Sequence, residues 1–191
     1  MRWSRRASVL ALLILIPWSA AEAQRVPDRS GFWFGAGIGL GSARLSCTIC
    51  TTGRDGGTSG YVHLGATVTK QLLVGGEVLA WYHTDNGIDF LLASVQAVVV
   101  LYPMRTSGFY IKTGLGVSNY SAKDSVNKVS SQALAGEIGV GYEVLVSNNI
   151  SMVPFANFLG TSGADVKFNN TVSSLGARTS LIQIGLGVTL H

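Results

Sequence analysis

The chain of 191 residues has little charge and little cysteine. Charged residues make up 13% of it, and nothing resembling a basic stripe is present, so nucleic acid is not an expected partner. Its two cysteines are too few for a four-ligand zinc site built from cysteine pairs. After residue 24 the chain also lacks eighteen consecutive apolar residues of helical character, which argues against a membrane-spanning helix. The chain is instead rich in glycine, with 24 residues.

The first 23 residues have the organisation of a secretory signal peptide. Three arginines lie within the first six residues, and Val9 to Pro17 is an apolar run too short to span a membrane. Ala21-Glu22-Ala23 is a small-x-small cleavage site, so we expect cleavage after Ala23. An uncleaved membrane anchor is the alternative. Residues 24–191 then form one domain that is close to neutral, because three of the basic residues leave with the leader.

Apolar residues in the remaining chain alternate with small or polar ones, which is the period of a half-buried strand. In the segment 31–43, Phe32, Ile38 and Leu40 share one face, and Trp33 and a row of glycines share the other. The seventh segment is the least regular, because Pro154 cannot donate a ladder hydrogen bond. Eight segments are predicted as strands: 31–43, 59–69, 72–83, 88–102, 108–122, 133–146, 149–161 and 176–190.

The connections between these segments differ in length in a regular way. Residues 44–58, 123–132 and 162–175 are predicted as long polar loops. Residues 70–71, 103–107 and 147–149 are predicted as short turns, and the link at 84–87 is modest. Long loops therefore occupy mostly one end of the sheet, as in outer-membrane barrels. Closure of the sheet pairs the backbone N–H and C=O groups that would otherwise be unpaired at its two edges. The prediction is therefore an all-β, eight-stranded, antiparallel up-and-down transmembrane β-barrel over residues 24–191.

Parity predicts what faces the interior of this barrel. The glycines fall mainly on the inner face beside occasional large residues, since eight strands leave room only for side chains. Glu77, Lys112, Glu137 and Glu143 fall on that face as well. They are expected to pair with one another and with Arg178 or water. Structural packing is the favoured interpretation of these charges, and a proton or ion pathway is the alternative.

Aromatic residues near strand ends fit the interfacial girdles of membrane barrels. Those predicted to do so are Tyr82, Tyr102, Phe109 and Tyr142. Strands are rich in aromatic residues in general, so this is a weaker indication.

The leader, the eight alternating strands, the segment "GFYIKTGLGVSNY" and the terminal amphipathic strand resemble the small outer-membrane β-barrels, OmpA-like or OmpX-like. The resemblance covers nearly all of the mature chain. It implies that the last strand is the signal for the barrel-assembly machinery, with Gln183, Gly185, Val188 and Leu190 matching the pattern in order. Members commonly end on Phe, whereas this chain adds His191.

Two stretches resemble reactive sites. Cys47-Thr48-Ile49-Cys50 is expected to form a local disulfide in an oxidising compartment, with free thiols, lipid attachment or metal chemistry as alternatives. His83-Thr84-Asp85 lies at a predicted rim, but the His-x-Ser element of lipid A deacylases is absent from the sequence. No residue is therefore assigned a catalytic, cofactor-binding or metal-binding role.

These observations predict a non-enzymatic protein of the bacterial outer membrane, with a structural or surface-interaction role for its extracellular loops. A narrow pore for ions or small solutes is one alternative, and a lipid-modifying hydrolase or a soluble lipocalin-like barrel are others. No cofactor is expected. The expected partners are outer-membrane lipid and the barrel-assembly machinery, and the expected state is a monomer.

Overall fold

The structure is a computed structural model of the chain. It describes residues 26–46, 53–124, 127–169 and 171–191, without the side chains of 173–175. The predicted signal peptide and the Cys47–Cys50 pair lie outside the described residues. No helix in the described ranges is long and apolar enough to cross a membrane.

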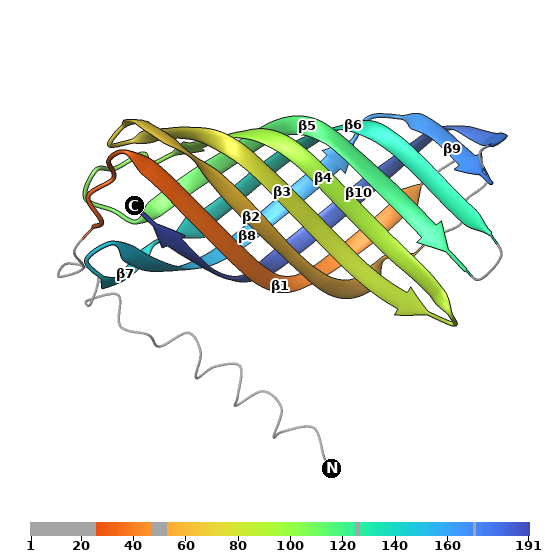
Figure 1. Cartoon of the computed structure of the whole chain (residues 1–191), viewed down its shortest axis with the longest axis horizontal. Helices are drawn as coiled ribbons and strands as arrows, with labels where there is room; N and C mark the ends of the chain where they lie inside the picture. Colours follow the sequence, from red (N-terminus) through yellow and green to blue (C-terminus); the bar gives the residue numbers. More distant parts are fainter. Residues whose placement is uncertain (1–25, 47–52, 125–126, 170) are drawn as a thin grey trace, which may run out of the picture.

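In the part of the chain that the structure describes, ten antiparallel strands form a single sheet. Figure 1 shows how these strands wrap around the barrel. Their bounds are β1 (Phe32–Ser46), β2 (Asp55–Thr69), β3 (Leu72–Asp85), β4 (Ile88–Leu101), β5 (Phe109–Lys123), β6 (Lys128–Tyr142), β7 (Val144–Ser147), β8 (Ile150–Thr161), β9 (Ala164–Phe168) and β10 (Thr171–Leu190). The strands β1 to β6 pair in sequence order, and β1 also pairs with β10, so the sheet closes on itself.

The ring has eight members because two of its strands are interrupted. Both β6 and β7 pair with β8, so β7 continues β6 after a break at Glu143. Both β8 and β9 lie between β6 and β10, so β9 continues β8. The predicted eight-stranded antiparallel barrel is confirmed. The described N-terminal segment and His191 lie at one end of the barrel, which we call the termini end, and we call the other the hairpin end (Figure 1).

Two predicted loops are wrong, and the loop predicted at 44–58 is shorter than expected, because β1 extends to Ser46 and β2 begins at Asp55. Residues 128–132 belong to β6, and residues 164–168 and 171–175 belong to β9 and β10, so strands occupy most of the expected loops at 123–132 and 162–175. Lys128 pairs directly with Lys123, and Phe168 pairs with Thr171. The backbone ladder continues in β6 although its residues at 128–132 are mostly polar, and the loss of alternation hid this part of the strand in the sequence. In β9 apolar and polar residues still alternate, but only over five residues, which is a short run from which to predict a strand.

Pro154 lies where the sheet has a gap. The β6–β8 ladder ends at Gly141 and Phe155, and the β7–β8 ladder begins at Val144 and Met152. The proline thus faces the interruption at Glu143, whose amide donates instead to Gly108 at 2.9 Å. A residue without an N–H is therefore tolerated here, and the predicted seventh strand is confirmed as β8.

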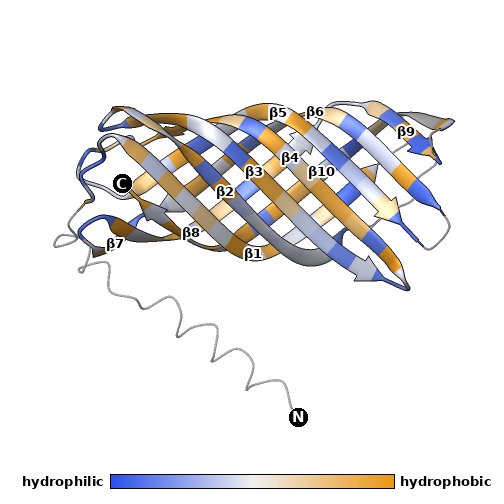
Figure 2. Ribbon diagram, viewed as in Figure 1, coloured by the Kyte–Doolittle hydropathy of each residue, from blue (hydrophilic) through white to orange (hydrophobic). Residues whose placement is uncertain are grey.

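The outer wall of the barrel is apolar over its middle. On β1 and β10 the outward residues from Phe32 to Leu40 and from Ile182 to Leu190 are apolar, and we call this zone the apolar belt. The side chains of Ile38 and Leu115 are 75% and 74% exposed. Figure 2 shows the resulting alternation of apolar and polar residues along the strands. Each apolar stretch is nine residues long, which matches the nine to eleven residues with which a tilted strand crosses a bilayer.

The inner wall alternates glycine with large side chains, as predicted. Gly37 faces the rings of Tyr61 and Phe155, and Gly41 faces Trp81. Each of these two glycines leaves space for an aromatic ring from another strand, because a Cβ at that position would collide with the ring. The barrel therefore encloses a packed interior.

Candidate functional site

A charged network crosses the middle of the lumen. Lys112 Nζ on β5 lies 2.8 Å from Glu137 Oε1 on β6 and 2.8 Å from Glu77 Oε1 on β3. Gln96 Nε2 on β4 donates to Glu137 Oε2 at 2.7 Å, and His63 Nδ1 on β2 lies 3.1 Å from Glu77 Oε2. All five side chains are buried. Each carboxylate is thus held by the ammonium and by one neutral or titratable nitrogen donor.

Strand register explains how these residues meet. His63 pairs with Glu77 across β2 and β3, and Glu77 pairs with Gln96 across β3 and β4, so the three lie on one inward-facing row. Lys112 reaches this row from β5, and its Nζ also lies 4.9 Å from the Tyr61 ring centre. Removal of one partner from a buried ion pair is costly because the other charge stays desolvated. The network therefore locks five adjacent strands together.

The predicted inner network is confirmed for Glu77, Lys112 and Glu137, but the prediction for Arg178 is wrong. Ala177 and Thr179 face inward on β10, so Arg178 points out of the barrel and its side chain is exposed. The error is one of parity, since Arg178 shares its face with Ile182 and Ile184.

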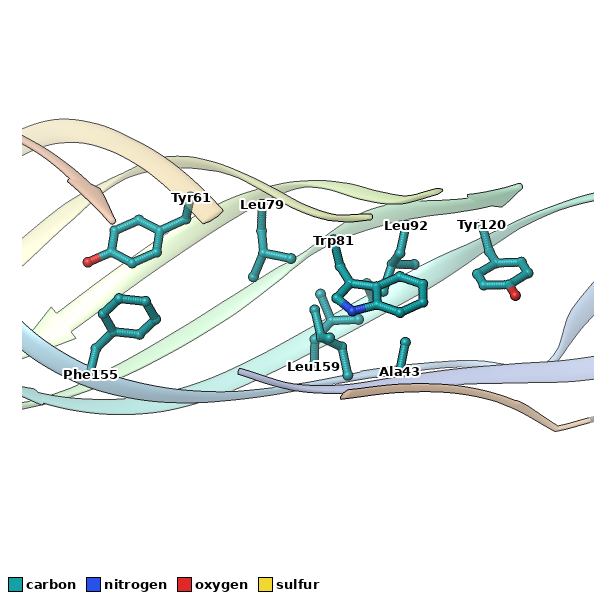
Figure 3. Packing of buried hydrophobic residues seen from close by; sticks show 10 residues of the cluster. Ala43, Tyr61, Leu79, Trp81, Leu92, Tyr120, Phe155 and Leu159 are labelled. Carbon is teal, nitrogen blue, oxygen red and sulfur yellow. The ribbon is translucent and has the colours of Figure 1, made fainter. Parts of the chain in front are cut away.

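Aromatic and aliphatic side chains fill the lumen between this network and the hairpin end (Figure 3). Trp81 is fully enclosed by this cluster, and its Nε1 donates to the Gly41 carbonyl at 3.1 Å. The members are Ala43, Tyr61, Leu79, Trp81, Leu92, Tyr120, Ala135, Phe155, Leu159 and Leu181. They come from strands all around the ring, so this layer closes the lumen across its full width.

A second polar cluster closes the termini end. The Arg29 guanidinium donates to Glu143 Oε2 at 3.1 Å and to the Ser107 carbonyl at 3.1 Å. It also stacks 3.4 Å from the centre of the Tyr102 ring. The other carboxylate oxygen of Glu143 accepts from Tyr102 at 2.6 Å and lies 2.9 Å from His191 Nε2. The segment before β1 and the last residue of the chain are therefore tied to the same carboxylate.

This termini-end cluster was only partly predicted. Glu143 faces inward as expected, but Tyr102 is buried in the cluster and is not part of an interfacial girdle, so that prediction is wrong. Tyr82 is 48% exposed on the outer wall, as a girdle residue should be. The role of Arg29 could not be predicted from the sequence. Arg29 precedes the first alternating segment, and periodicity does not indicate where a residue outside such a segment points.

Little space is left between these layers. The interior cavity bounded by Trp33, His63, Tyr102 and Glu143 has a volume of about 10 Å³. A single water molecule requires at least that much. On the inner wall formed by β8 and β10, Asn157 Nδ2 donates a hydrogen bond to Gln183 Oε1 at 3.0 Å. The described residues therefore form a filled lumen.

The rim histidine of the sequence analysis has a packing role. His83 stacks between Trp81 and Phe90, with ring centres 5.9 Å away on each side. Asp89, beyond the apolar belt, accepts hydrogen bonds from Tyr82 and Thr84 at 2.8 Å each. These two hydroxyls lower the pKa of the Asp89 carboxyl below its ordinary value. Within the described ranges, no three His, Cys, Asp or Glu side chains are arranged to hold a metal ion.

Known structures share this fold. The chain matches Neisserial surface protein A (NspA) with a TM-score of 0.61 and 17% identity, over 84% of this chain and 97% of that one. It matches Ail, the attachment invasion locus protein of Yersinia pestis, in complex with the heparin analogue sucrose octasulfate, with a TM-score of 0.56 and 16% identity over 84% and 99%. It matches the outer membrane protein OprG from Pseudomonas aeruginosa with a TM-score of 0.50 and 16% identity over 86% and 98%.

No protein-family model matches the sequence, and a search of curated proteins finds no significant match. The similarity is therefore one of three-dimensional structure, at identities where the fold persists and the sequence has diverged. The fold is that of the small eight-stranded outer-membrane β-barrels, and the resemblance inferred from the sequence is confirmed at that level.

Proposed function

We propose that the protein is a non-enzymatic barrel of the bacterial outer membrane, with a solid lumen as scaffold and its hairpin end outside the cell. The termini end faces the periplasm, where the predicted signal peptide is removed after Ala23. The hairpin end carries β-hairpins that extend beyond the apolar belt and are available for contacts at the cell surface. The chain works as a monomer, with outer-membrane lipid around the belt.

The observation that carries this proposal is the filling of the lumen. Three layers of side chains follow one another along the barrel axis: the cluster around Trp81, the network around Lys112, and the termini-end cluster of Arg29 and Glu143. A scaffold requires a rigid interior and does not require an open channel. Buried ion pairs and closely packed aromatic rings make the interior rigid. The narrow pore is the competing function.

Single-channel recording in planar bilayers separates the two functions. The refolded residues 24–191 should give no discrete conductance steps, because the Trp81 layer blocks the axis. A control barrel of known conductance must give steps under the same conditions. Regular steps of one amplitude from the refolded chain would establish the pore and reject the scaffold.

Membrane placement has its own test. The mature chain should fractionate with outer membranes and migrate differently on a gel with and without boiling, as closed barrels do. The terminal strand supports insertion by the barrel-assembly machinery, since Gln183 and Gly185 face inward and Val188 and Leu190 face outward. His191 turns inward to Glu143, which leaves Leu190 as the last outward side chain.

A surface-contact role is supported by the extended hairpins and by the relative that was solved with a heparin analogue. Sulfated polysaccharides are thus the first partners to test with whole cells that display the barrel. The described rim residues do not favour a lipid-modifying hydrolase, because His83 is stacked between two rings and no described acid or serine is bonded to it.

A further inference from the structure

Two arginines on neighbouring strands and a third from the segment before β2 lie close together on the outer wall at the hairpin end. Arg44 on β1 pairs with Ser180 on β10, and Arg178 pairs with Ser46, so the two arginines are diagonal neighbours. Diagonal residues on one face of a sheet have their Cα atoms about 7–8 Å apart, within reach of long side chains. Both side chains are exposed and point away from the lumen.

Arg54 joins this pair from the segment just before β2. Its Nη1 donates to Ser180 Oγ at 3.3 Å, and its Nη2 donates to the Ser42 carbonyl at 3.0 Å. The side chain therefore lies across β1 and ends beside the residue that pairs with Arg44. We call Arg44, Arg54 and Arg178 the arginine patch.

The depth of the arginine patch is set by the apolar belt. The belt ends at Leu40 on β1 and Ile182 on β10, and Arg44 and Arg178 lie four residues beyond. At about 3.3 Å per residue this is about 13 Å along tilted strands. Arg54 extends back toward the level of Ser42 and Ser180, closer to the belt. Because the strands of such barrels tilt by about 40°, Arg44 and Arg178 lie about 10 Å above the belt, at the outer edge of the lipid headgroup region, and Arg54 reaches back into that region.

The positive charge of the patch has no described counter-charge. Among the described residues, no carboxylate forms an ion pair with any of the three arginines. Asp55, next to Arg54, shares the parity of Ser59 and Tyr61 and so faces the lumen side. Asp89 on the outer wall is already bonded to Tyr82 and Thr84. Three clustered cations repel one another, so an anion at this position is stabilising.

We propose that the arginine patch binds a phosphate group of a phosphorylated glycolipid in the outer leaflet. The planar guanidinium presents paired donors that match phosphate oxygens, and several guanidiniums around one phosphate give charge-assisted hydrogen bonds. The acyl chains of the same lipid would pack on Leu40, Ile182 and Ile184 directly below. A soluble polyanion is the less favoured ligand, because the patch faces sideways toward the bilayer and not toward the hairpin tips.

This inference rests on the proposed membrane placement, and the experiment separates the two. Wild-type protein and the variant R44Q/R54Q/R178Q are refolded, checked for heat-modifiable migration, and placed in nanodiscs. Native mass spectrometry then measures binding of diphosphorylated lipid A and of the same lipid after phosphate removal. We expect the wild type to prefer the phosphorylated lipid, and the variant to lose about tenfold in affinity for it, as expected for loss of charge-assisted bonds.

The matched control is K123Q/K128Q/K167Q, which removes the same charge from β5, β6 and β9 at the same end of the barrel. It should keep the wild-type affinity. Binding of heparin and of inorganic phosphate is measured with the same proteins. Equal loss of lipid binding in both variants, no preference for the phosphorylated lipid, or a loss confined to heparin or inorganic phosphate overturns the arginine patch as a lipid site. If the triple variant does not fold, R44Q/R178Q is tested in the same way, with the same expected direction. A wild-type chain that never becomes heat-modifiable instead overturns the membrane placement.

Discussion

The Arg29 guanidinium lies 3.1 Å from the Glu143 carboxylate, although the two residues are 114 positions apart in the chain. Both side chains are almost fully buried. The segment before β1 is thereby fixed inside the mouth of the barrel, against the break between β6 and β7. The alternation of apolar and polar residues does not predict this contact, yet it joins the segment before β1 to the break between β6 and β7.

Arg29→Ala should destabilise the barrel by about 3–5 kcal/mol, because it leaves Glu143 buried with an unpaired charge. The measurement is urea unfolding in detergent micelles or lipid, followed by loss of heat-modifiable migration. Lys70→Ala is the control, since it breaks an exposed pair with Asp28, the residue before Arg29, and should cost about 0–1 kcal/mol. Equal costs for both would show that Arg29 is not paired in the lumen.

Lys112→Met should also cost about 3–5 kcal/mol, since Glu77 and Glu137 then share the lumen without their cation. Neutralising both carboxylates in the triple variant K112M/E77Q/E137Q should recover part of the loss, which is the sign of coupled residues. Unfolding in urea measures both. If the triple variant is less stable than K112M, the two carboxylates do not depend on the lysine.

Gly41→Val should disrupt folding, because its side chain would enter the space occupied by Trp81. We expect a loss of about 1–3 kcal/mol or failure to close the barrel, as for overpacked cores. Gly136→Val is the matched substitution, because a Cβ there lies on the outer wall at ordinary contact distances, 3.7 Å from the end of the Leu115 side chain and 4.0 Å from the Gly114 carbonyl oxygen. Refolding yields in the same lipid compare the two, and a harmless Gly41→Val would refute the packed lumen.

Ile184→Arg tests the lipid-facing wall. Ile184 is 57% exposed within the apolar belt, so an arginine there should cost about 2–4 kcal/mol. Asn119→Arg, on an outward position near the hairpin end of β5, should cost about 0–1 kcal/mol because it lies near the interface. Equilibrium unfolding from lipid vesicles gives both values. Equal costs would mean that the apolar belt does not face hydrocarbon.

Asp89 supplies a prediction for pH. Hydrogen bonds from Tyr82 and Thr84 favour its charged form and lower its pKa, so the bonds stabilise the β3–β4 hairpin above the ordinary pKa of Asp. Their contribution is lost as pH falls through the lowered pKa. Tyr82→Phe should raise the midpoint of the Asp89 carboxyl in an NMR titration, and Tyr142→Phe should leave it unchanged. A midpoint that is the same in all three proteins would contradict the contact.

The sequence predicted the wall of the barrel well and its ends poorly. Alternation identifies a strand only where one of its faces is apolar. Leu134 and Ile138 therefore indicated a strand, whereas Ser130 and Ser131 of the same strand did not. Parity also correctly placed Glu77, Lys112 and Glu137 inside the barrel. When the apolar face of a strand contacts lipid, a charged residue on the opposite face must point into the lumen. The same rule, correctly counted, puts Arg178 outside.

The partners of the inner residues could not be read from the sequence. Whether Gln96 bonds to Glu137 depends on side-chain reach across two strands, and register alone pairs Gln96 with Glu77. Arg29 and His191 lie beyond the ends of the regular pattern, so only the folded chain shows that both meet Glu143. Strand patterns therefore predict whether a side chain faces the lumen or the outer wall, but they do not predict which other side chains it contacts.

The seam between β1 and β10 joins the earliest and latest parts of the domain to be synthesised. Until Leu190 has emerged, an incomplete chain has two open sheet edges with unpaired amides and carbonyls, and such edges invite aggregation. Closure is thus a late event that requires the longest possible contact in sequence, and contacts of this kind form slowly. The nascent polypeptide consequently needs protection during its passage to the membrane, and a stop codon before β10 would leave the cylinder split.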